Sequence, residues 1–99
     1  MTSHPQICRA IRLRTLVEFD YDGHHRVVAP YCHGVTRKNV EVLRAIQVGG
    51  SSRSAGFGFG KLWHVGKMTN LRGTDERFVP TDPNYNPDDS VMLRIHCRI

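Results

Sequence analysis

The alternation of side chains on either side of an Asp-Gly dipeptide constrains the fold more than any other feature of this sequence. Residues 15–21, TLVEFDY, place Val, Phe and Tyr on one side and Leu, Glu and Asp on the other, which is typical of a strand. Asp22 and Gly23 favour a tight turn, and HHRVVAP at residues 24–30 favours a second strand that ends or bends at its proline. This stretch therefore predicts a β-hairpin.

Two loop lengths are compatible with this hairpin. A two-residue loop places Tyr21 opposite His24, and a four-residue loop places it opposite Arg26. Both loops preserve the parity of the pairing, so the same residues share one face in either case. That face is expected to carry Phe19, Tyr21, Arg26 and Val28.

Three further segments have strand character. HGVTRKNVEVLRAIQVGG, residues 33–50, predicts a second hairpin with residues 37–39 at its tip. KLWHVGKMTNLRG, residues 61–73, predicts two short strands bent near Gly66. Residues 91–99 alternate in a way that predicts a half-buried strand with a basic outer face. Its buried side is expected to consist of Val91, Leu93, Ile95, Cys97 and Ile99.

A short helix is predicted over residues 3–13. Ser3 can cap it with Gln6 three residues later, and the apolar residues that follow have helical spacing: Ile7, Ala10 and Ile11. Three arginines occupy other positions of the helix, and we interpret them as a solvated face on a helix that lies over a sheet: Arg9, Arg12 and Arg14.

The length of 99 residues allows one small domain with a single core. We divide residues 1–99 into the helix, a barrel over residues 15–80, a turn-rich segment over 81–90 and the strand over 91–99. About five to seven short strands with one helix predict a mainly β fold, either a strongly bent sheet or a small barrel.

The charge balance favours partners that carry phosphate. Lys and Arg number 14 against nine Asp and Glu, a formal net charge of +5, and arginine is much commoner than lysine. The planar guanidinium suits bidentate phosphate contacts and stacking on bases better than an ammonium does. Solubility alone is the alternative explanation, since small domains often carry such a charge.

Several classes of function are disfavoured. Cys8, Cys32 and Cys97 are odd in number and far apart, so we expect small core residues in a reducing cytoplasm rather than a secreted disulfide framework. The spacing of Cys and His favours neither a metal nor another cofactor. Nothing resembles a nucleophile elbow or a paired-carboxylate site, so we expect no enzyme. No run approaches the ~18 apolar residues of a membrane span.

Two features have both a structural and a functional interpretation. Arg44 interrupts an otherwise apolar alternation, either as an edge or snorkelling residue or as a guanidinium aimed into a pocket. The Gly- and Ser-rich stretch 49–60 and the residues after it interleave cations and rings, as sites that bind single-stranded nucleic acid do: Arg53, Phe57, Phe59, Lys61 and Trp63. Alternatively, the rings belong to the core and Arg53 is a solvated loop charge.

Taken in order, LVEFDYDGHHRVVAPYCHGVTRKNVEVLRAIQVGGSSRS, LWHVGKMTNL and ERFVPTDPNYNP resemble the WYL-like domain of bacteria over residues 11–88. The most specific parts are FDYDG with Arg26 and Pro30, HGVTRKN leading into LRAIQVGG, and VGKMTNL leading to RFVP. In place of the Trp-Tyr-Leu triplet that names the family the chain has VEVL, so only Leu43 matches.

The resemblance implies an Sm-like or SH3-like small β barrel that serves as a sensor module in bacterial regulators of transcription, DNA damage or phage defence. It also implies that Tyr21, Arg26, Arg44 and Lys67 lie at or beside the positions where the family binds nucleic acids or nucleotides. The helix-turn-helix domain that usually precedes the module is not in this sequence, so action on DNA would need a DNA-binding partner protein.

The sequence therefore predicts a cytoplasmic, non-catalytic regulatory module that binds single-stranded nucleic acid or a nucleotide. Phosphate contacts are expected from Arg26, Arg44, Arg53 and Lys67, and base stacking from Tyr21 and Trp63. The alternative is a protein interaction module that pairs with itself as a homodimer, or with another subunit, without binding nucleic acid.

Overall fold

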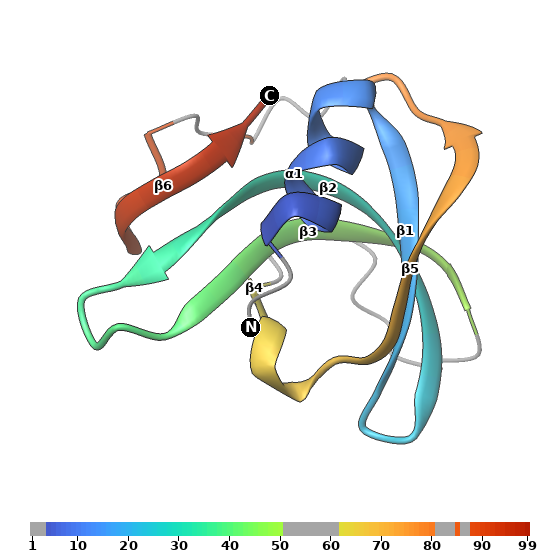
Figure 1. Cartoon of the computed structure of the whole chain (residues 1–99), viewed down its shortest axis with the longest axis horizontal. Helices are drawn as coiled ribbons and strands as arrows, with labels where there is room; N and C mark the ends of the chain where they lie inside the picture. Colours follow the sequence, from blue (N-terminus) through green and yellow to red (C-terminus); the bar gives the residue numbers. More distant parts are fainter. Residues whose placement is uncertain (1–3, 51–61, 81–84, 86–87) are drawn as a thin grey trace.

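The computed structural model describes residues 4–50, 62–80, 85 and 88–99 of the chain. One helix, α1 (His4–Leu13), lies against an antiparallel sheet of six strands (Figure 1). The strands are β1 (Thr15–Tyr21), β2 (His24–Thr36), β3 (Glu41–Gly50), β4 (Leu62–His64), β5 (Thr69–Arg77) and β6 (Met92–Arg98). A 3₁₀ turn, η1 (Val65–Lys67), joins β4 to β5. The expectation of a mainly β chain with a short N-terminal helix is confirmed.

The first hairpin has the shorter of the two expected loops. Tyr21 pairs with His24, and Phe19 pairs with Arg26. Asp22 and Gly23 form the loop with φ of 52° and 76°. Positive φ at both loop positions is the backbone of a type I′ turn, whose twist matches that of the two strands and which Asp-Gly favours. Tyr21 and Arg26 are therefore held on one face of the hairpin.

The sheet is open, and the expectation of a closed barrel is wrong. The strands follow the order β4-β3-β2-β1-β5, and β6 pairs with the second half of β2. Closure would need a ladder between β4 and β5, but β4 has only three residues and the chain leaves it through the turn η1. Within the described ranges, β4 pairs only with β3 and β5 only with β1.

The main core lies between α1 and the sheet. Ile7 and Ile11, with Ala10, form the buried side of the helix at the spacing that the sequence predicts. They pack with Phe19 and Trp63, whose rings meet edge to face at 5.4 Å between centroids. A second, smaller cluster contains Leu16, Ala29 and Tyr31. The cap that Ser3 was expected to provide lies outside the described residues.

The last strand differs from its expected alternation. Leu93 was expected on the buried side, but its exposed fraction is 66%, while Met92 is buried at 7%. The ladder between β2 and β6 contains two register shifts, and each lets an extra residue of β6 pass between paired positions. A bulge of this kind changes which face a side chain points to, so a period of two does not continue along the strand.

The cysteines also differ in part from expectation. Cys8 on α1 and Cys97 on β6 form a disulfide, so these two are not separate small core residues, and the cysteines do not support the expected reducing compartment. Cys32 is a free and fully buried thiol, as expected. The disulfide joins the first helix to the last strand, which lie side by side in Figure 1. Over the described part of the chain, no helix is long and apolar enough to cross a membrane.

Candidate nucleic-acid interface

Three of the six residues that the sequence singled out meet inside the fold. The rings of Tyr21 and Trp63 lie edge to face with centroids 5.0 Å apart. The guanidinium of Arg26 lies 5.8 Å from the Tyr21 centroid and 5.5 Å from that of Trp63. All three side chains are buried, and Trp63 is completely so. A base could stack on these rings only after the core opened.

Arg26 is a buried cation. Its guanidinium donates to Oε1 of Gln47 at 3.2 Å and to the carbonyl oxygen of Tyr21 at 3.4 Å. Its Nε is buried without a hydrogen-bond partner, and among the described residues no carboxylate forms an ion pair with it. Two aromatic faces and two neutral acceptors therefore hold the charge of Arg26.

Arg44 has an acidic partner on another part of the molecule. Its Nε donates to Asp89 Oδ2 at 2.7 Å, and Nη2 donates to Oδ1 at 3.2 Å, a two-point contact between largely buried side chains. Burial alone would raise the pKa of Asp89, but the hydrogen bonds from Arg44 and from the Val91 amide hold that pKa below its ordinary value. Arg44 thus fastens the segment before β6 to β3.

Lys67 does not join these groups. Lys67 is exposed at the end of η1 and lines a depression of about 610 Å³ at the tip of the first hairpin. Asp20 and Asp22 line the same depression, so two carboxylates oppose the approach of a phosphate there. Arg53 lies outside the described residues.

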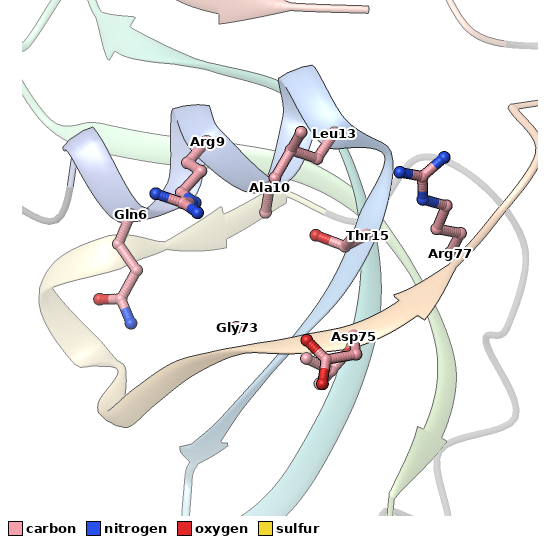
Figure 2. A pocket seen from close by; sticks show the side chains of 9 residues that line it. Gln6, Arg9, Ala10, Leu13, Thr15, Gly73, Asp75 and Arg77 are labelled. Atoms are coloured by element: carbon pink, nitrogen blue, oxygen red, sulfur yellow. The ribbon is translucent and has the colours of Figure 1, made fainter.

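A different surface concentrates exposed positive charge, and we call it the arginine cleft. It consists of two adjoining depressions of about 450 and 460 Å³ that share Leu13 and Arg77. Arg9 lines the first, between α1 and β5, and Figure 2 shows Arg9 and Arg77 on its two sides. Arg12 and Arg14 line the second, together with the partly buried ring of Phe78.

The charge of the arginine cleft is scarcely offset. Its four arginines are exposed, and among the described residues none of them forms an ion pair. In the part of the chain that the structure describes, Asp75 is the one carboxylate that lines either depression, so four positive groups face one negative group. Two hydrogen bonds join the helix side of the cleft to the β5 side. The Phe78 amide donates to the Arg14 carbonyl at 2.9 Å, and Gln6 Nε2 donates to the Leu71 carbonyl at 3.2 Å.

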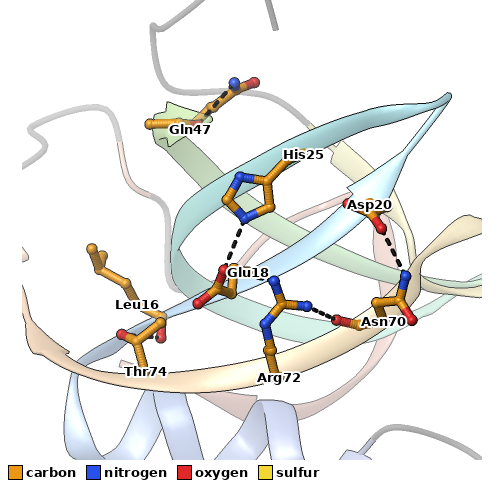
Figure 3. A network of polar contacts seen from close by, with 9 residues as sticks. Leu16, Glu18, Asp20, His25, Gln47, Asn70, Arg72 and Thr74 are labelled. Atoms are coloured by element: carbon orange, nitrogen blue, oxygen red, sulfur yellow. Dashed lines mark hydrogen bonds and ion pairs between the residues drawn. The ribbon is translucent and has the colours of Figure 1, made fainter. Parts of the chain in front are cut away.

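The neighbouring arginine on β5 has a different environment. Arg72 donates to Glu18 Oε1 at 2.9 Å and to the Asn70 carbonyl at 2.8 Å, within the polar network of Figure 3. His25 also bonds to Oε1 of Glu18, at 2.8 Å. The hydrogen bond with His25 lowers the pKa of Glu18, partial burial opposes this, and the charge of Arg72 lowers it further. Arg72 is therefore neutralised locally.

The sequence contained part of the signal for the arginine cleft. The sequence places Arg9, Arg12 and Arg14 on the predicted helix, where the local spacing indicates only a solvated face. Arg77 lies more than sixty positions later, and it reaches the helix because Thr15 pairs with Arg77 across the ladder between β1 and β5. That register depends on two shifts in the ladder, which no local pattern indicates.

One group of side chains has the composition of a metal site. Cys8, His33 and Cys97 place their sulfur and nitrogen atoms within 4.8 Å of one another. The sequence offered only loose pairs of His and Cys, because these three residues come from α1, β2 and β6.

Comparisons with protein-family models, with curated proteins and with solved structures found no match to this chain. The resemblance to the WYL-like domain therefore stays a prediction from the residues quoted above.

Proposed function

We propose that this chain is a non-catalytic, WYL-like regulatory module of the bacterial cytoplasm and that it binds single-stranded nucleic acid through the arginine cleft. One observation carries the proposal: four exposed guanidinium groups face one carboxylate along two adjoining depressions. Uncompensated arginines on one surface attract phosphate and give a salt-dependent affinity.

The extent of the arginine cleft favours a strand over a free nucleotide. The arginines line two depressions, so they can contact successive phosphates of a backbone rather than a single phosphate group. Phe78 lies among them, partly exposed, and its ring packs on Tyr31 at 5.6 Å between centroids. A ring fixed in this way beside cations is suited to stack on an unpaired base.

The residues predicted from the sequence enter the proposal in different ways. Lys67 is exposed, but Asp20 and Asp22 line the same depression, so it adds little to the attraction of phosphate. Arg26 and Arg44 are engaged inside the fold, so a phosphate contact by either would require exchange of its present partners. Stacking on Tyr21 or Trp63 would likewise require the core to open, and Phe78 needs no such change.

The test is an anisotropy titration with labelled single-stranded and duplex oligonucleotides at two salt concentrations. The double variant Arg12→Gln with Arg77→Gln removes two charges from the arginine cleft. It should weaken binding of the single strand by about tenfold or more. The slope of log affinity against log salt should also become shallower, by about 1.4 for two lost phosphate contacts.

A matched control removes the same charge elsewhere. Arg37 and Arg94 are exposed and line neither depression of the arginine cleft, so the variant Arg37→Gln with Arg94→Gln has the same net charge as the test variant. It should bind nearly as the wild type does. An equal loss in the control would mean that net charge, and not this surface, attracts the ligand. Absence of binding at low salt by the folded wild type would end the proposal.

The competing class is a protein interaction module, and it has one observation in its favour. Val40, Val42, Leu62 and Val91 line a depression of about 560 Å³ beside the tip of the second hairpin. Self-association through such a surface would appear as a mass that rises with protein concentration and persists at high salt. Phosphate binding would weaken under the same conditions.

A further inference from the structure

A buried histidine faces the disulfide. His33 lies on β2 with no exposed surface, and its Nδ1 is 3.7 Å from the Cys8 sulfur and 3.8 Å from the Cys97 sulfur. The other ring nitrogen, Nε2, contacts Oε2 of Glu41 at 2.6 Å. The ring therefore directs one nitrogen to two sulfurs and the other to a carboxylate.

This arrangement has the composition and spacing of a zinc site. Zinc binds cysteine sulfur at about 2.3 Å and histidine nitrogen at about 2.0 Å, so sulfur and nitrogen ligands of one tetrahedral ion lie about 3.6 Å apart. The two sulfur-to-nitrogen distances around His33 are close to that value. Only the two sulfurs, bonded in the disulfide, are closer together than a metal allows, and reduction frees them to separate.

Glu41 completes the pattern. A histidine that ligates zinc usually donates its second N–H to a carboxylate or carbonyl, which fixes the tautomer and the direction of the ring. Glu41 is largely buried and contacts Nε2, and Nδ1 is the ring nitrogen that faces the two sulfurs. The ring directed at the two sulfurs and the carboxylate behind it together form the arrangement that is common for a histidine that ligates zinc.

We propose that the reduced chain binds one zinc ion through Cys8 Sγ, Cys97 Sγ and His33 Nδ1, with Glu41 as the positioning residue and water at the fourth position. A dithiol reductant supplies two electrons and two protons, which cleave the S–S bond to two thiols while the reductant becomes a disulfide. Zinc then binds both sulfurs as thiolates and releases two protons to solvent. The softer thiolate ligands favour zinc over magnesium or calcium.

The experiment titrates the whole chain with cobalt, a spectroscopic substitute for zinc, and then displaces the cobalt with zinc. The wild type is compared after reduction with a phosphine and after oxidation to the disulfide. The reduced chain should bind one metal ion per molecule and show a thiolate-to-cobalt charge-transfer band. The oxidised chain should show neither. Because these two samples have the same sequence, the comparison does not depend on a variant that folds.

Two variants locate the site. Cys97→Ser should abolish the band, and Glu41→Gln should keep the band but weaken metal affinity about 10–100-fold. Cys32→Ser is the matched control, because Cys32 is the remaining thiol and bonds to Met92 Sδ rather than to this cluster. It should bind as the wild type does. No band from the reduced and folded wild type, or an undiminished band from Cys97→Ser, would overturn the proposal.

Discussion

Reducing the disulfide between Cys8 and Cys97 should remove a large share of the stability of the fold. The two cysteines are separated by 89 positions, so the bond closes almost the whole described chain into one loop. A bond across so long a loop restricts the unfolded chain strongly, and its loss restores that freedom. We expect the reduced chain to stay folded but with a much smaller free energy of unfolding.

The loop length sets the magnitude. For a loop of 89 residues the chain-entropy relation gives about 4.6 kcal/mol at 25 °C, and measured losses for native disulfides of small domains are about 2–5 kcal/mol. A domain of this size has a total stability of about 5–15 kcal/mol. With a urea dependence of about 1.5 kcal/mol per M, a loss of 4.6 kcal/mol lowers the unfolding midpoint by about 3 M.

The assay is urea unfolding followed by circular dichroism, with and without a phosphine reductant and always with a chelator so that no metal can bind. The double variant Cys8→Ser with Cys97→Ser is the control. Its midpoint should match that of the reduced wild type and should not respond to the reductant. A fall of less than about 0.5 M on reduction of the wild type would refute the entropic argument, because about 0.75 kcal/mol is far below the expected range.

Three further predictions concern other parts of the fold. Asp89→Asn should lower the free energy of unfolding at neutral pH by about 3 kcal/mol, because it removes the negative charge from a largely buried two-point contact with Arg44. Folding lowers the pKa of Asp89, so the pair stabilises the fold fully at pH values above the ordinary pKa of 3.8. As the pH falls through the lower pKa of the folded state, the free energies of unfolding of variant and wild type, measured by urea titration, should converge. Gly34→Ala should destabilise the fold by about 3 kcal/mol or more in thermal unfolding, because a Cβ there would overlap the backbone carbonyl of Arg94 on the facing strand, whereas the same change at an exposed site would be nearly neutral. Cys32 should resist alkylation at neutral pH in the folded, reduced chain, because burial and, to a smaller extent, the charge of Asp89 raise the pKa of its thiol to about 11. Mass spectrometry that found Cys32 labelled as fast as Cys8 and Cys97 would contradict this prediction.

Local patterns predicted the elements well where each element follows one period. The first hairpin follows directly from alternation and the Asp-Gly turn, and its register leaves Tyr21 and Arg26 on one face as expected. The helix follows from the spacing of Ile7, Ala10 and Ile11. These features depend on neighbours in the sequence, so a single chain is enough to infer them.

The predictions that are wrong concern the faces of β6 and the closure of the sheet, which depend on how distant strands pair. The bulges between β2 and β6 expose Leu93 and bury Met92, and no residue type near them indicates this. The sheet stays open because β4 is short, although the number of strands would allow a barrel. Registers of this kind are set by contacts between distant segments, which periodicity does not encode.

In the candidate sites, too, the sequence indicates local features but not contacts between distant segments. Tyr21, Arg26 and Trp63 do meet, but in the core, since one sequence cannot distinguish a ring that packs from a ring that stacks on a ligand. The sequence leaves Arg44 as either an edge residue or a pocket residue, and it does not indicate the two-point contact with Asp89 because 45 positions separate the two residues. The arginine cleft and the cluster around His33 likewise combine residues from opposite ends of the chain.

The bond between α1 and β6 also determines how the fold responds to a pulling force. Tension applied to the chain on the outer sides of Cys8 and Cys97 passes through one covalent bond, and of the described ladders only the pair of Cys32 with Arg98 lies outside that bond. After reduction the same tension would run through the sheet, and the ladder that holds β6 against β2 would be loaded first. The oxidation state of a single pair of sulfurs therefore decides whether the sheet is shielded from mechanical load or forms part of the path that transmits it.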